Sequence, residues 1–161
     1  MLARETDKSQ IVDALELRFA AGCSVAPDTY AMLRHSAYAR TLRIFLDELN
    51  RPVGYVSWAS VNRASLDRLL RIGQPPKYPY EWSEGGICLI LDVLILRRAR
   101  YDAVRQLRKF TRTKRVIVAL RKGKTARLYL RTQRGFVKRN LTGQRVEVRC
   151  TASAASRHGT V

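Results

Sequence analysis

Apolar and polar residues alternate with two different periods in the first half of the chain. A period near 3.6 predicts amphipathic helices over residues 9–21, 29–39 and 62–72, while a period of two predicts strands over residues 42–46 and 53–60. The segment between the strands contains turn-forming residues, so the two strands should form an antiparallel hairpin. Asp28 is the predicted cap of the second helix, and the Gly-Gln-Pro-Pro sequence should end the third.

A continuous apolar run at residues 87–96 is broken only by Asp92. Such a run is typical of a strand buried on both faces. A carboxylate in that setting must accept hydrogen bonds, pair with a cation, stay protonated or border a cleft, because an unpaired buried charge is costly. Asp92 is therefore either a satisfied structural residue or a candidate functional one.

The second half of the chain is patterned in the same way. We expect a helix at 100–111, a hairpin with strands at 115–120 and 126–132, and a last strand at 145–150. Residues 151–161 form a small-residue tail that is expected to be disordered. The order of elements predicts one α+β domain over residues 1–150, with a mostly antiparallel central sheet and flanking helices.

Charge is distributed unevenly along the 161 residues, whose net charge is +18. Residues 1–96 hold 11 basic and 11 acidic side chains, whereas residues 97–149 hold 19 basic side chains and only Asp102 and Glu147 as acids. A half with such an excess should meet an acidic partner: nucleic acid, a phospholipid surface or an acidic protein.

The positions of the cysteines and histidines argue against disulfide bonds and metal sites. Cys23, Cys88 and Cys150 are far apart and lack Cys-x-x-Cys spacing, which argues against a disulfide framework or a zinc site. His35 and His158 stand alone, so no metal is expected. The longest apolar run is about half of what a membrane helix needs, and the first residues lack an apolar signal core. A soluble, cytoplasmic protein is the prediction.

Gly54 interrupts the second strand of the predicted hairpin. Glycine weakens a strand, and it commonly marks a bulge or the close approach of a ligand or a second backbone. Two interpretations remain open: a bend filled by a neighbouring ring, and an approach site for a ligand.

Three segments, RPVGYVSWA, EWSEGG and LILD, occur in the order found in one enzyme family. Together with the chain length, they resemble the toxin-activating lysine acyltransferases, the family of hemolysin-activating and adenylate-cyclase-toxin-activating proteins. The resemblance covers roughly residues 43–135, and its basic hairpin corresponds to residues 121–135. The matching residues are Pro52, Val53, Tyr55, Ser57, Trp58, Ala59, Trp82, Gly85 and Asp92.

Membership of this family, as an active or a degenerate member, implies a fold similar to the N-acetyltransferases. It also implies transfer of a fatty acyl chain from acyl carrier protein to lysine ε-amines of a repeat-in-toxin protein, with no bound cofactor. The family commonly forms homodimers. Asp92 matches the family's catalytic aspartate. The residues that would flank the acyl thioester or the substrate are Gly54, Tyr55, Ser57, Trp58 and Trp82.

The chain departs from the family at the second catalytic residue. The family has a histidine some thirty residues before the Pro-Val strand, and here residues 22–27 read Gly-Cys-Ser-Val-Ala-Pro. His35 is the only N-terminal histidine and is the candidate for that role, against the alternative of an ordinary helix-surface histidine. Cys23 lies near the expected place, without neighbours that mark an activated thiolate. The family's Trp-Ile-Ala-Pro-Phe segment after the aspartate is also replaced.

In this interpretation the basic half binds the strongly acidic carrier protein. The predicted carrier-docking residues are Arg105, Arg108, Lys109, Arg121, Lys122 and Lys124. The alternative is a nucleic-acid-binding module without catalysis, whose basic hairpin contacts phosphates. Tyr129 and Phe136 do not form a ribonucleoprotein-type aromatic pair, so stable nucleic-acid binding is not expected.

Overall fold

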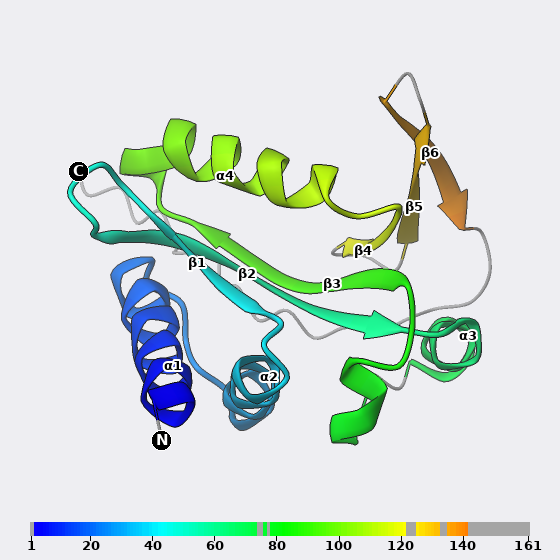
Figure 1. The fold of residues 1–161 in the computed structure, drawn as a ribbon, viewed down its shortest axis with the longest axis horizontal. Coiled ribbons are helices and arrows are strands. Elements are labelled where there is room, and N and C mark those ends of the chain that lie inside the picture. Colours follow the sequence, from blue (N-terminus) through cyan, green and yellow to red (C-terminus); the bar gives the residue numbers. More distant parts are fainter. Residues whose placement is uncertain (1, 74–75, 77, 122–124, 133–134, 142–161) are drawn as a thin grey trace, which may run out of the picture.

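The computed structural model describes residues 2–73, 76, 78–121, 125–132 and 135–141. They form helices on both faces of one six-stranded sheet (Figure 1). The helices are α1 Leu2–Ala20, α2 Pro27–Tyr38, α3 Arg63–Ile72 and α4 Arg100–Arg112, with 3₁₀ turns η1 Pro79–Trp82 and η2 Arg97–Ala99. The strands are β1 Leu42–Leu46, β2 Pro52–Val61, β3 Ile87–Ile95, β4 Val116–Arg121, β5 Thr125–Thr132 and β6 Gly135–Leu141.

The strands lie in the sheet in sequence order, from β1 to β6. Four neighbouring pairs are antiparallel, and β3 and β4 are the parallel pair. Helix α4 makes the crossover between those two strands, as a parallel connection requires. The predicted α+β class with a mostly antiparallel sheet is therefore confirmed.

Three apolar clusters hold the helices on the sheet. On one face, α1 and α2 pack Ile11, Leu17 and Leu33 against Tyr55 of β2 and Leu94 of β3. Farther along the sheet, a second cluster joins Leu66 and Leu69 of α3 to Trp82, Leu89 and Val118.

The opposite face of the sheet is covered by α4. Ala103 and Phe110 of this helix pack on Val56, Trp58 and Cys88. The Gln106 side chain also bonds both backbone groups of Leu46, which ties α4 to the end of the edge strand β1. The side chains of α1 and α4 that reach the sheet are thus separated by its full thickness.

Most predicted elements occur within a few residues of their expected limits, and α3 has the clearest ends. Asn62 caps its first turn by accepting a hydrogen bond from the Ser65 amide, and Gly73 ends it with a positive φ of 71°. The prediction of Asp28 as the cap of α2 was wrong. Ala26 is the cap there, because Pro27 occupies the first helical position, which favours its fixed φ and missing N–H.

Strand β6 was not predicted, since Gly-Phe-Val-Lys-Arg-Asn-Leu lacks alternation, and it forms by backbone pairing with β5 at the sheet edge. The predicted strand at 145–150 and the tail at 151–161 lie outside the described residues.

The interpretation of β3 as buried on both faces was correct only for its first half. Cys88 and Leu89 are buried, whereas Val93 is 37% exposed. The pairing with β4 accounts for this difference, because it covers only Ile87 to Ile90 of β3.

Candidate functional site

Asp92 lies on β3 next to an irregularity in the sheet. Ser57 of β2 pairs with Asp92, but the next residue, Trp58, pairs with Ile90, so Leu91 is an extra residue on β3. A bulge of this kind locally changes the direction in which side chains point. Leu91 packs with the cluster around α3, and Asp92 contacts α1, so both side chains lie on the face covered by α1, α2 and α3.

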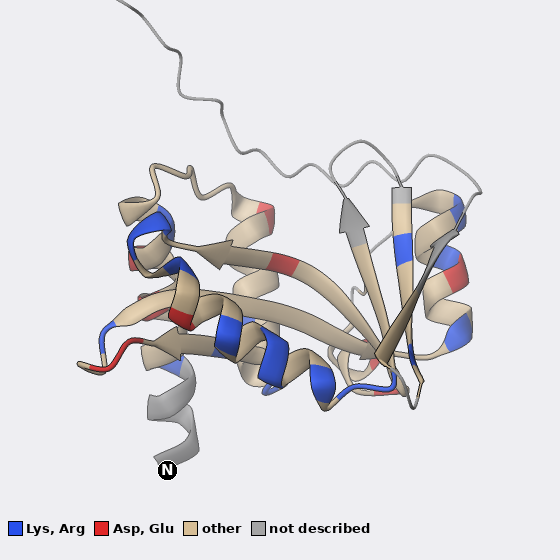
Figure 2. Ribbon diagram, turned by 90° about the horizontal axis from the view of Figure 1, so that it is seen from above, with Lys and Arg blue, Asp and Glu red and all other residues tan. Residues whose placement is uncertain are grey.

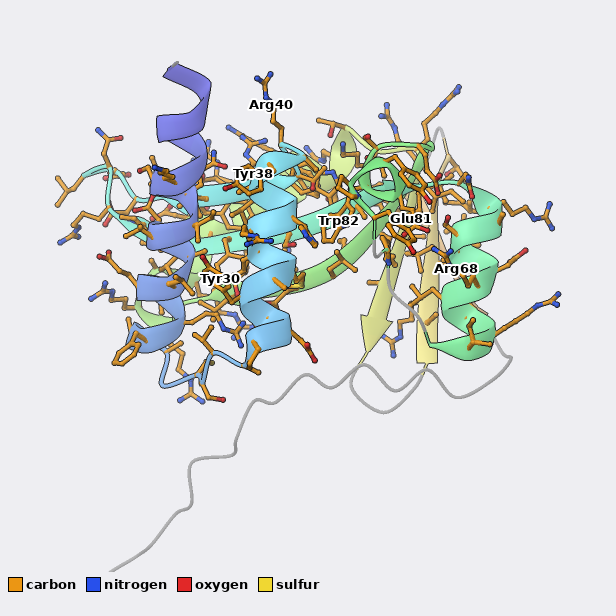
Figure 3. All side chains as sticks on the ribbon, turned by 90° about the horizontal axis from the view of Figure 1, so that it is seen from below. Tyr30, Tyr38, Arg40, Arg68, Glu81 and Trp82 are labelled. Atoms are coloured by element: carbon orange, nitrogen blue, oxygen red, sulfur yellow. The ribbon has the colours of Figure 1, made fainter. Side chains whose placement is uncertain are left out.

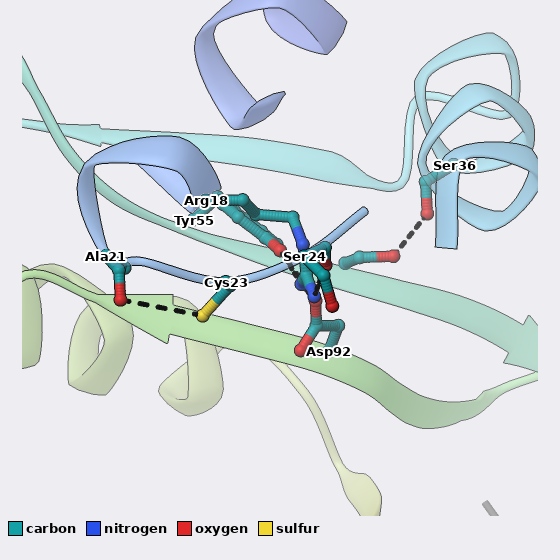
Figure 4. A network of polar contacts seen from close by, with 8 residues as sticks. Arg18, Ala21, Cys23, Ser24, Ser36, Tyr55 and Asp92 are labelled. Carbon is teal, nitrogen blue, oxygen red and sulfur yellow. Dashed lines mark hydrogen bonds and ion pairs between the residues drawn. The ribbon is translucent and has the colours of Figure 1, made fainter. Parts of the chain in front are cut away.

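The Asp92 carboxylate is held by two donors (Figure 4). Arg18, in the last turn of α1, donates to Oδ2 at 2.7 Å, and the Tyr55 hydroxyl donates to the same oxygen at 2.6 Å. Arg18 also donates to the Tyr55 hydroxyl at 2.8 Å and to the Ser24 carbonyl at 3.2 Å. Oδ2 of this partly buried acid is therefore held in a closed triangle of charge-assisted hydrogen bonds.

One oxygen of Asp92 remains available. Among the described residues, Oδ1 accepts no hydrogen bond, whereas both bonds to the carboxylate end on Oδ2. The Asp92 side chain is 20% exposed, while that of Arg18 is 9% exposed. The site thus presents a partly exposed carboxylate that is fixed through Oδ2 by a buried cation and a hydroxyl, and whose Oδ1 has no hydrogen-bond partner among the described residues.

Electrostatics keep the two donors protonated. Burial raises the pKa of the Tyr55 hydroxyl well above its ordinary value of 10, and the neighbouring negative charge of Asp92 raises it further. Burial alone would lower the pKa of Arg18, but its hydrogen bond to Tyr55 and the carboxylate of Asp92 outweigh that, and the pKa is raised. Arg18 stays charged, so it is not a candidate base.

We predict that one of the protein's seven tyrosines resists ionisation. Because the folded state raises the pKa of Tyr55, deprotonation above pH 10 favours the unfolded state, and stability should fall as pH rises beyond that value. An absorbance titration at alkaline pH should show a late transition that Tyr55→Phe lacks, with the other tyrosines unchanged. A wild-type titration identical to that of Tyr55→Phe would contradict this.

His35 is not brought to Asp92. It lies on α2, and its ring contacts Trp82 edge-on, with ring centroids 5.9 Å apart. Trp82 is buried in η1 beside Glu81, which pairs with Arg68 of α3 (Figure 3). In the described part of the chain, the partners of Asp92 are Arg18 and Tyr55 instead.

The predicted substrate-flanking residues separate onto the two faces of the sheet. Tyr55 belongs to the cluster under α1 and α2, and Ser57 is buried with its hydroxyl 2.5 Å from that of Ser36 on α2. Trp58 lies under α4, where its ring centroid is 4.5 Å from that of Phe110. Trp82 packs near α3. Of this group, Tyr55 donates a side-chain hydrogen bond to Asp92, and Ser57 is its strand partner on β2.

At Gly54, a second backbone approaches closely. An added Cβ would lie 2.6 Å from the Leu94 carbonyl oxygen and 3.3 Å from the Phe45 ring. The glycine is therefore explained by its neighbours in the protein.

Comparison of the chain with protein-family models, with curated proteins and with solved structures finds no match. Within the described residues, no helix combines the length and the apolar composition needed to cross a membrane. The same residues contain no group of three or more histidine, cysteine or acidic side chains placed to hold a metal ion.

The predicted docking residues lie mainly on α4. Arg105, Arg108 and Lys109 are exposed on that helix. Arg121 ends β4. Lys122 and Lys124 lie outside the described residues.

Sequence reasoning missed Arg18, although a signal was present. Ile11, Ala14 and Arg18 follow the spacing of one helix face, and the first two are core residues. A charged residue at a position where the helical period predicts an apolar residue indicates that the charge has a partner inside the protein. Cys23, near the position where the family has histidine, is half-buried and has its thiol 3.9 Å from the Ala21 carbonyl oxygen.

Proposed function

We propose that the chain transfers a fatty acyl group from acyl carrier protein to a lysine ε-amine of a repeat-in-toxin protein, with Asp92 as the base. The observation that carries the proposal is a partly exposed carboxylate, fixed beside a bulge through Oδ2, whose Oδ1 has no hydrogen-bond partner among the described residues. The resemblance of the segments around β2, η1 and β3 to the lysine acyltransferases supports the same assignment.

The arrangement of β3 and β4 supports a thioester-binding role. Their parallel pairing ends at Ile90 and Ala119, and β3 continues to Ile95 with β2 as its strand partner. Past Ile90, the side of β3 that faces β4 has no strand partner among the described residues. An extended acyl-bearing arm can add to such an edge through main-chain hydrogen bonds. We infer a sheet of the N-acetyltransferase type, because β3 and β4 form a parallel pair in an otherwise antiparallel sheet and their pairing ends before β3 does.

The chemistry requires a neutral amine next to the thioester. Oδ1 of Asp92 takes a proton from the lysine ammonium, and the amine nitrogen attacks the thioester carbonyl. The new C–N bond forms, the C–S bond breaks, and the nitrogen loses its second proton to give the neutral amide. Of the two protons that leave the nitrogen, one protonates the departing carrier thiolate and the other passes from Asp92 to solvent, which restores the carboxylate. Arg18 and Tyr55 hold the carboxylate in one orientation through Oδ2, which leaves Oδ1 directed at the substrate.

We expect Asp92→Asn to lower the rate of acyl transfer by at least about 100-fold, because the amide cannot accept the proton. The assay mixes the full chain with long-chain acyl carrier protein and a lysine-bearing toxin fragment, and detects the acylated fragment by mass spectrometry. Asp67→Asn, at an exposed acid on α3, is the matched control and should keep the wild-type rate.

Two results would overturn the assignment. Transfer that survives Asp92→Asn at the wild-type rate removes the base role. A wild-type chain that transfers nothing, yet binds oligonucleotides in a salt-dependent way, favours the nucleic-acid-binding alternative.

A further inference from the structure

Helix α4 presents a continuous basic stripe to solvent. Its apolar side is formed by Ala103, Leu107 and Phe110, which face the sheet. On the opposite side, residues spaced three and four apart fall in one row. The members of this stripe, all exposed, are Tyr101, Arg105, Arg108, Lys109 and Arg112.

The stripe has no internal charge partner. The three ion pairs found in the described part of the chain use Arg18, Arg51 and Arg68, all before the basic half. Residues 97–115 contain nine basic side chains and one acid, Asp102. Figure 2 shows the basic residues following one another along α4. Mutual repulsion in such a row is relieved when an acidic surface covers it.

The stripe also includes an exposed aromatic ring. Tyr101 is 81% exposed at the first turn of α4. Aromatic residues are enriched at protein interfaces, where a large ring gains contact area at low entropy cost. From Tyr101 to Arg112 the row is about 16 Å long, which equals the length of about three turns of a partner helix lying along it.

The position of α4 relates the stripe to the candidate site. The helix joins the end of β3 to the start of β4, two strands whose parallel pairing ends at Ile90 and Ala119. It covers the sheet face opposite α1, from which Arg18 reaches Asp92. A partner on α4 therefore lies across the sheet from the Arg18–Asp92 contact and beside the open edge of β3.

We propose that this stripe is the docking surface for the acidic carrier protein, and that the two substrates approach from opposite faces of the sheet. The acyl arm passes from the α4 side along the open edge of β3, and the lysine reaches Asp92 from the side of α1 and α2. This assignment rests on the proposed acyl transfer and names where its donor binds.

The test measures carrier binding separately from chemistry. Binding of acyl carrier protein bearing a non-hydrolysable acyl group is followed by fluorescence anisotropy at low and high salt. The variant Arg105→Glu/Arg108→Glu should lose at least about tenfold in affinity at low salt and less at high salt, because salt screens exposed charges. Arg105→Gln/Arg108→Gln should lose less. The control Arg34→Glu/Arg71→Glu, at exposed arginines of α2 and α3, should bind as wild type.

The outcomes separate this inference from the proposed function. A wild-type chain that binds the carrier through the stripe but transfers no acyl group overturns the catalytic proposal and supports the docking surface. Wild-type affinity in the Arg105→Glu/Arg108→Glu variant overturns the docking surface even when transfer occurs. Binding of single-stranded oligonucleotides by the stripe, without affinity for the carrier, also overturns it.

Discussion

Replacing Arg18 by methionine should lower the free energy of unfolding by about 3 kcal/mol, the lower end of the cost of breaking a buried ion pair. The substitution removes the cation and leaves the Asp92 carboxylate with Tyr55 as its donor. Water can reach Asp92, which is 20% exposed, and this places the cost at the lower end. Urea unfolding followed by circular dichroism measures the change.

A double variant tests the physical cause. Arg18→Met/Asp92→Leu removes both charges, so no unpaired carboxylate remains, and much of the lost stability should return. Arg51→Met is the matched control, because the Arg51–Asp47 pair is exposed on the arginine side and should contribute little to stability. A double variant that is destabilised by the sum of the two single changes would contradict a direct coupling between Arg18 and Asp92.

The same pair explains how far the sequence could predict the site. Asp92 could be recognised as a candidate from its neighbours in the sequence alone, because it is the single charged residue in an apolar run. Arg18 was not, because its partner lies 74 residues away on another element. The family resemblance made His35 the candidate for the second catalytic residue, but in the fold its ring contacts Trp82. Long-range pairing of this kind depends on the register of β2 and β3, which local patterns do not specify.

The bulge at Leu91 was unpredictable for a related reason. Strand registers are indicated by alternation of apolar and polar residues, and residues 87–91 are uniformly apolar. The hairpin of β1 and β2 was predicted well, since alternation and turn residues agree there. Features that depend on one segment, or on two strands joined by a short turn, could thus be predicted. Features that depend on contact between segments far apart in the sequence could not.

Gly85 is a described position where a single added methyl group should have a large steric effect. A Cβ there would lie 2.1 Å from the Val61 carbonyl oxygen and 2.4 Å from the Asn62 nitrogen. Both are backbone atoms, at the end of β2 and at the cap of α3, so no side chain can rotate away. Gly85→Ala should therefore destabilise the fold by about 3 kcal/mol or more, at or above the usual range for overpacking.

The neighbouring glycine supplies a matched control. Gly86 has no atom within 4 Å of an added Cβ, so Gly86→Ala should change the free energy of unfolding by less than about 0.5 kcal/mol. Equal stability of the two variants would show that the segment between η1 and β3 is not held against β2 as described. If Gly85→Ala instead unfolds at lower urea and Gly86→Ala does not, the contact that aligns β3 with β2, and with it the position of Asp92, depends on this glycine.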